Sequence, residues 1–221
     1  MFIEAIIIIF IISVIKKYDF QNLKYFPEKG YIFPLIFFIL RFISLIEIKL
    51  PIGSKFFVIL NMIGMLLLFI YIYLNLNYDG MLMMGVGLSF NFFVMIINGG
   101  KMPIDAYFFA KLVDEKIYNL TYNGYSLFHT IINNNTNFPL MGDVIPLLKP
   151  YIFPKIVSIG DIVMATGFII LFTSVLKGKY TLEKDDEDKV YVDRLIHHKE
   201  TKAKNHEDRD IKIYKRTKNE D

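Results

Sequence analysis

Apolar runs separated by short polar turns make up most of the first 176 residues. They cover residues 2–15, 31–50, 56–74, 81–97 and 151–176. A helix needs roughly 20 apolar residues to cross the ~30 Å hydrocarbon core of a bilayer, and the last four runs come close to that length. The first run reaches only ~22 Å at 1.5 Å per residue, so it must either thin the bilayer or lie partly at the interface. The pattern therefore predicts an all-α, polytopic membrane protein with about five transmembrane helices.

The connection between the fourth and fifth runs is predicted to contain a surface helix followed by a polar loop. Residues 103–118 are weakly amphipathic and begin with a proline, which suits the first turn of a helix. The segment is too charged to span, so we expect a helix on the membrane surface with Tyr107, Phe108 and Leu112 dipping inward. Residues 119–150 are rich in asparagine and indicate a polar outer loop.

The charges divide the chain and orient it. Thirteen of the 25 basic and 12 of the 22 acidic residues follow Leu176. We expect residues 1–176 to form a transmembrane domain and residues 177–221 a charged, largely disordered tail. Lysines also gather after the first run and at the start of the tail, and cytoplasmic flanks retain positive charge. The N-terminus is therefore expected outside, and the tail in the cytoplasm, where it could contact a protein partner.

Composition narrows the function classes. The net charge of +3 comes without a basic stripe interleaved with aromatic residues, so nucleic acid is not an expected partner. The chain has no cysteine, which excludes disulfides and thiolate chemistry. No metalloprotease, nucleophile-elbow or phosphate-loop motif is present. We predict no metal and no cofactor, and the lipid bilayer is the first expected partner.

Four polar residues interrupt the predicted spans: Arg41, Asn61, Asn91 and Asp161. Counting from the predicted helix ends places all four in the outer half of the membrane. A charge near the bilayer centre costs at least ~2.5 kcal/mol, so Arg41 and Asp161 need partners, and each is the simplest partner for the other. Such a pair could serve only to fix helix register, or it could belong to a functional site. Asn61 and Asn91 are typical of interhelical hydrogen bonds.

Further polar residues extend the candidate site toward the outer surface. Gly99 and Gly100 could present backbone amides to an anion beside Lys101, although the same glycines also suit the end of a helix. A lone histidine in a polar loop, His129, is either a surface residue or a ligand. The candidate ligand-binding residues are Arg41, Asn91, Asn98, Gly99, Gly100, Lys101, His129, Asp143, Ser158 and Asp161.

An enzymatic alternative rests on Asp161 and Asp143. The stretch Ser158-Ile159-Gly160-Asp161 resembles the Gly-x-Gly-Asp element of intramembrane aspartyl proteases, in which two aspartates share a proton to activate water. Here Ser158 replaces the first glycine, and Gly142-Asp143 would supply the second acid. No catalytic residue is assigned on this basis.

Four elements follow one another in a distinctive order: Asn-Gly-Gly-Lys-Met-Pro, a histidine-bearing loop, Gly-Asp-Val-Ile-Pro, and Ser-x-Gly-Asp in the last apolar run. This order, over residues 80–170, resembles a family of small, uncharacterised bacterial integral membrane proteins. The resemblance implies a bacterial cell membrane and no particular activity. We therefore expect a protein that binds or moves a small anionic or lipid-linked ligand in an outward-facing polar pocket, or a membrane subunit of a complex. An aspartyl protease and a structural scaffold are the alternatives.

Overall fold

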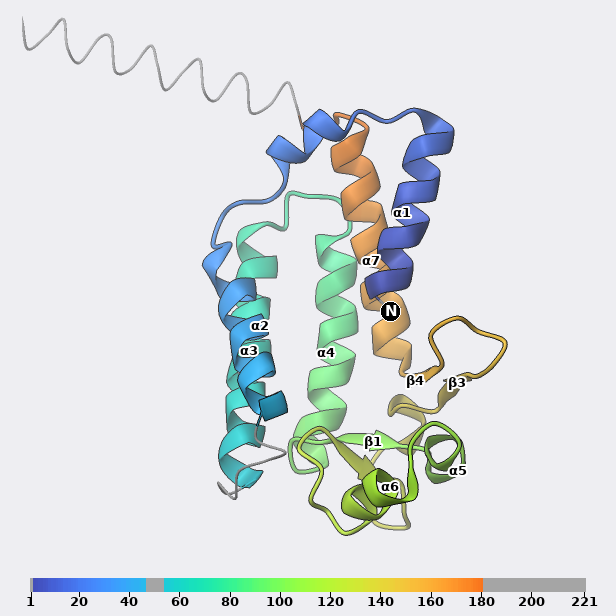
Figure 1. Cartoon of the computed structure of the whole chain (residues 1–221). Coiled ribbons are helices and arrows are strands. Elements are labelled where there is room, and N and C mark those ends of the chain that lie inside the picture. The colour runs from blue at the N-terminus through green and yellow to red at the C-terminus, as the bar shows by residue number, and fades with distance from the viewer. Residues whose placement is uncertain (1, 47–53, 181–221) are drawn as a thin grey trace, which may run out of the picture. The chain divides into compact units, whose positions relative to one another are not determined.

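Five long helices form the main part of the fold. The computed structural model describes residues 2–46 and 54–180. The long helices are α1 (Phe2–Lys16), α2 (Ile32–Ile46), α3 (Ser54–Leu74), α4 (Met81–Ile97) and α7 (Ile159–Leu176) (Figure 1). The apolar runs thus form helices as predicted, and α4 has the predicted bounds. The end predicted for the second run and most of the turn after it lie outside the described residues.

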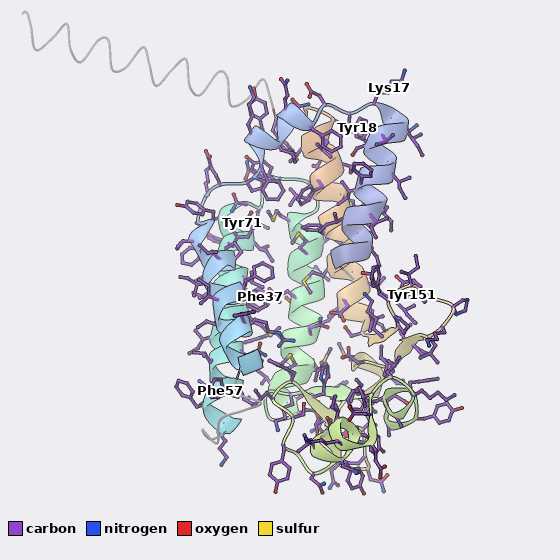
Figure 2. The ribbon with its side chains drawn as sticks, in the orientation of Figure 1. Lys17, Tyr18, Phe37, Phe57, Tyr71 and Tyr151 are labelled. Carbon is purple, nitrogen blue, oxygen red and sulfur yellow. The ribbon has the colours of Figure 1, made fainter. Side chains whose placement is uncertain are left out.

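The helices pack in an order that differs from their order in the chain. α2 packs on α3, α3 on α4, α4 on α7, and α7 on α1. Phe37, labelled in Figure 2, lies on the face of α2 that meets Gly64 of α3. The strongest contact is between α4 and α7, so the last helix lies between the fourth and the first.

Glycines bring α4 and α7 unusually close. A Cβ added to Gly87 would lie 2.5 Å from the carbonyl oxygen of Gly160 and 2.6 Å from the amide nitrogen of Met164. Gly80 and Gly167 meet in the same way seven residues away on each helix, which makes the two helices antiparallel. Small residues allow helix backbones to approach in this manner.

Two of these helices are long and apolar enough to cross a membrane, judged by length and composition within the described residues. They are α3, over Lys55–Leu74, and α7. Shorter apolar helices cover Ile32–Phe42 and Met81–Ile97. The fold is therefore mostly helical with two candidate spans, and a five-span topology stays a prediction.

The connection between α4 and α7 differs most from expectation. It contains β1 (Met102–Ile104), α5 (Ala106–Ala110), α6 (Glu115–Tyr122), β2 (His129–Ile131), η3 (Pro139–Met141), β3 (Ile145–Leu147) and β4 (Lys155–Val157). β1 pairs with β2 in parallel, and β3 pairs with β4 in antiparallel fashion. The predicted all-α class is therefore wrong in this region, because the polar loop contains two small sheets.

The single surface helix predicted over residues 103–118 is also wrong. Pro103 lies in β1, and two separate short helices follow. The side chain of Asp105 accepts a hydrogen bond from the amide of Phe108 at 2.9 Å and so caps α5. Asp114 caps α6 through the amide of Ile117. Two aspartate caps nine residues apart start two helices, where the hydrophobic pattern alone indicated one.

A small apolar cluster supports the connection from within. Its buried members are Ile104, Phe109, Ile131 and Ile156. They come from β1, α5, β2 and β4, so these four short elements share one core. Phe108 and Leu112 pack against the cluster, whereas Tyr107 is 63% exposed. The connection is a packed unit of structure, and this burial offsets the poor intrinsic stability of two-stranded sheets.

The last helix begins at Ile159, eight residues later than the predicted start of the fifth run. Ser158 is its N-cap: the Ser158 hydroxyl accepts from the amide of Asp161 at 3.0 Å, and the Asp161 carboxylate accepts from the amide of Ser158. This reciprocal pair is a capping box. Asp161 therefore lies in the first turn of α7, nearer to the helix end than a count from residue 151 had placed it.

At the opposite ends of the helices, polar side chains hold the loop between α1 and α2. This loop contains η1 (Phe20–Tyr25). The hydroxyl of Tyr71, labelled in Figure 2, donates to the carbonyl of Pro27 at 3.0 Å. Asn75 donates to the carbonyl of Lys29 at 2.7 Å. The ordered loop fixes the end of α3 against the start of α2.

Candidate functional site

The strand β1 brings three side chains of the α4–α7 connection together. On one side it pairs with β2, and the amide of Met102 donates to the carbonyl of Phe128 at 2.7 Å. On the other side, the amide of Asp143 donates to the carbonyl of Pro103 at 2.8 Å. The backbones come close here because the residue before Asp143 is glycine, where a Cβ would meet Pro103. Phe128, His129 and Asp143 are therefore positioned by one strand.

His129 and Asp143 form a contact between β2 and the segment on the far side of β1. The Nε2 atom of His129 lies 3.3 Å from Oδ2 of Asp143. Asp143 is only 6% exposed, and its Oδ1 atom is buried without a hydrogen-bond partner among the described residues. Burial raises the pKa of Asp143, and the neighbouring Asp161 adds to the rise, while His129 and Arg41 oppose it.

Arg41 does not make the direct ion pair that the sequence suggested. Its Nη1 atom donates to Oδ1 of Asn61 on α3 at 3.1 Å, and its guanidinium carbon lies 3.7 Å from the centre of the Phe128 ring. Asp143 and Asp161 both interact with Arg41 electrostatically, without a hydrogen bond between them in the described part of the chain. The charge of Arg41 is thus held by a neutral amide and an aromatic face.

Asn91 joins α4 to the start of α7. Its Nδ2 donates to Oδ1 of Asp161 at 2.8 Å, and its Oδ1 accepts from the hydroxyl of Ser158 at 2.8 Å. One amide side chain therefore engages both members of the capping box. The interhelical hydrogen bonds expected for Asn91 and Asn61 are present, and they tie α4 to α7 and α2 to α3.

The Asn98-Gly99-Gly100 stretch ends α4. The amide of Gly100 donates to the carbonyl of Met95 at 2.7 Å, and the amide of Gly99 donates to the carbonyl of Ile96. Both glycines have positive φ, at 71° and 80°. These are the features of a Schellman motif. Of the two interpretations of the glycines, the helix cap is the one the structure supports, because both amides already have partners.

The two residues beside these glycines, Asn98 and Lys101, also have hydrogen-bond partners within the connection. The Asn98 side chain donates to the carbonyl of Asn137 and accepts from its amide, both at 2.9 Å, so it attaches the end of α4 to the loop before η3. Lys101 donates to the carbonyl of Gly124 at 2.7 Å, and burial lowers the pKa of Lys101. Both side chains act in holding the connection together.

The structure thus separates the ten candidate residues into two groups. Six of them gather with Asn61 and Phe128 in a polar cluster made of Arg41, Asn61, Asn91, Phe128, His129, Asp143, Ser158 and Asp161. Asn98, Gly99, Gly100 and Lys101 have structural contacts outside it. Sequence reasoning missed Phe128, for which a lone aromatic residue beside the loop histidine was the only signal. No group of three potential metal ligands occurs among the described residues.

The fold and cluster define a class: a mostly helical protein with two apolar helices of membrane-spanning length and a cluster of charged and amide side chains at one end of them. Residues 23–173 match a family of unknown function, DUF5317, and the chain belongs to that family. An uncharacterized protein of Thermotoga maritima is 28% identical over 180 residues, covering 81% of this chain and 94% of that protein. No solved structure matches the chain. The expected membership in a family without a known activity is thereby confirmed.

Proposed function

We propose that this protein is a multi-pass protein of the bacterial cell membrane whose polar cluster faces the outside and binds a small anionic or lipid-linked ligand. The N-terminus lies outside, and residues 177–221 form a cytoplasmic tail. The observation that carries the binding proposal is Arg41, a cation on an apolar helix whose guanidinium has no hydrogen bond to a carboxylate within residues 2–46 and 54–180. An anionic group on a ligand would complete its pairing.

The surface of the helices supports the membrane part of the proposal. Only 39% of the residues in the α3 span and 33% of those in α7 are buried, whereas an equally apolar helix in a soluble core would be mostly buried. Large apolar side chains point outward on other helices too, including Ile15 at 70% and Phe42 at 65% exposure. Soluble monomers rarely expose apolar surface on this scale. Lipid is the solvent that such a surface fits.

The chemistry of Arg41 supports the ligand part. A guanidinium carries five N–H donors, and one of those of Arg41 is used by Asn61. Arginine binds phosphate and carboxylate groups through paired donors, and such bonds are about twice as strong as neutral ones. The Phe128 ring covers one face of the guanidinium, so a ligand would approach along its edge.

Titration of the full-length chain in maltoside micelles tests the proposal. Inorganic phosphate and dihexanoyl phosphatidic acid serve as probes, and isothermal titration calorimetry measures their affinities. We expect saturable binding that weakens ~10-fold or more in the Arg41→Gln variant, because a charge-assisted contact is lost. Lys111→Gln is the matched control, since Lys111 donates a hydrogen bond to the Tyr107 hydroxyl and lies outside the polar cluster. Equal weakening in both variants, or no binding of either probe, would refute the proposal.

The geometry supports the intramembrane aspartyl protease less well than it supports ligand binding. An aspartyl dyad needs two carboxyl groups that share a proton directly. Asp143 and Asp161 influence each other electrostatically, but the described contacts of Asp161 are with Asn91 and Ser158, and those of Asp143 are with His129. A purely structural scaffold would leave Arg41 without a ligand, and the titration above distinguishes it.

A further inference from the structure

We propose that the ligand of the polar cluster is zwitterionic, with an anionic group at Arg41 and an ammonium donor at Asp143, as in a phosphoethanolamine group. This inference rests on the proposed function and adds the second half of the ligand. It follows from the charges around Arg41, which are not those of a simple anion site.

The acceptor half of the site is Asp143. Its Oδ2 atom contacts His129, while Oδ1 is buried and has no hydrogen-bond partner in the part of the chain that the structure describes. An unpaired buried acceptor is unfavourable, so a donor that reaches it contributes to binding. An ammonium group has both the charge and the N–H donors that Oδ1 lacks.

Neither single charge fits the cluster as well. A simple anion at Arg41 would lie within the electrostatic reach of two carboxylates, Asp143 and Asp161. A simple cation at Asp143 would lie within reach of the guanidinium. Like charges brought together in this way disfavour the wrong ligand. A molecule that carries both signs avoids both repulsions.

Three soluble probes separate the two halves of the ligand: phosphoethanolamine, phosphocholine and inorganic phosphate. Phosphocholine keeps the positive charge and has no N–H donor. We expect phosphoethanolamine to bind ~10-fold more tightly than either of the others, because only it fills Oδ1 of Asp143. In the Asp143→Asn variant this preference should shrink, because the carboxylate that would accept from the ammonium group is gone. The comparison of the three probes uses the wild-type chain, so it does not depend on whether a variant folds.

The outcomes are distinct. Equal binding of phosphoethanolamine and phosphate, with both lost in Arg41→Gln, would overturn the zwitterion inference and leave the proposed function standing. No binding of any probe would overturn both. Dihexanoyl phosphatidylethanolamine distinguishes the source of the group: tighter binding than phosphoethanolamine assigns the site to a lipid headgroup, and equal binding assigns it to a free molecule.

A second inference comes from a different observation, the apolar tips of two loops. We infer that these tips insert into the membrane leaflet on the side of the polar cluster. The tips are Phe138 with Leu140, and Ile152 with Phe153. Leu140 is 77% exposed and Ile152 is 81% exposed, among the most exposed large apolar side chains described.

Contacts place both tips beside apolar helices. The ring of Phe138 packs edge-on against Phe93 with centroids 5.4 Å apart. Phe93 is one turn, ~6 Å, before the end of α4, so the loop descends along the side of that helix. Lys155, which lies three residues after Ile152, forms an ion pair with Glu4 in the first turn of α1. The tips therefore lie next to helix surfaces that the proposed function assigns to lipid.

The chain has no tryptophan, which makes a fluorescence test clean. Leu140→Trp, Ile152→Trp and the control Asn134→Trp each introduce a sole reporter, the last in an exposed polar turn. In phosphatidylcholine vesicles containing brominated lipid, we expect strong quenching and blue-shifted emission for the first two variants alone. Quenching no stronger than that of the Asn134→Trp variant would overturn the inference.

Discussion

Replacing Gly87 by alanine should force α4 and α7 apart. The added Cβ would lie 2.5 Å from the carbonyl oxygen of Gly160, and ordinary contacts begin at 3.4 Å. The difference is about 0.9 Å, and the obstructing atoms are backbone on both sides, so rotation of a side chain cannot relieve it. Overpacking of this kind costs typically ~1–3 kcal/mol.

Two further terms enter the estimate. Alanine gains ~0.8–1 kcal/mol over glycine in a helix interior, which opposes the clash. Separation by about 0.9 Å would stretch the 2.8 Å hydrogen bonds from Asn91 to Asp161 and Ser158 beyond a useful length, and each contributes ~0.5–1.5 kcal/mol. We expect a net destabilisation of ~1–5 kcal/mol and weaker binding at the polar cluster.

Gly85→Ala is the matched control. It lies on the same helix, two residues away, and the nearest atom to its Cβ is Cγ2 of Ile72, a side-chain end at 3.3 Å. It should therefore be neutral or slightly stabilising. Unfolding in mixed detergent micelles gives the stabilities, and phosphate titration reports on the cluster. Equal stability of the two variants would refute the close approach as the reason for glycine at position 87.

Three other outcomes are expected. Because the raised pKa of Asp143 makes the folded protein hold that proton more tightly than the unfolded chain does, the free energy of unfolding should fall as pH rises from ~3.9 through the folded pKa. Asp143→Asn should flatten this fall in unfolding curves across that range, and an unchanged slope would show that another group causes it. Asn98→Ala should cost ~1–2 kcal/mol by releasing the α4 cap from Asn137, compared with no measurable cost for Asn134→Ala. Neither the wild-type protein nor Asp161→Asn should cleave a transmembrane peptide, and cleavage lost only in the variant would revive the protease interpretation.

Local signals in the sequence determined the helices. Long apolar runs and the turns between them located α1 to α4, and the Asn-Gly-Gly stretch ended α4 because glycine adopts the backbone conformation of a C-cap. The start of α7 was also encoded locally. Ser158-x-x-Asp161 is the signature of a capping box, and Pro154 argues against a helix through residues 151–158. The apolar side chains of β4 obscured this signal, since a buried strand and a span look alike over a few residues.

Only the tertiary structure decided which polar residues meet. Arg41 and Asn61 are 20 residues apart, Asn91 and Asp161 are 70 apart, and His129 reaches Asp143 across β1. Counting residues from the predicted helix ends could place Arg41 and Asp161 in the same half of the membrane. It could not show that the amide of Asn61 and the ring of Phe128 contact Arg41. Those contacts depend on the packing order α2–α3–α4–α7 and on the short sheet that positions the connection. Helical periodicity is a property of neighbouring residues, whereas this site is a property of which helix faces pack together.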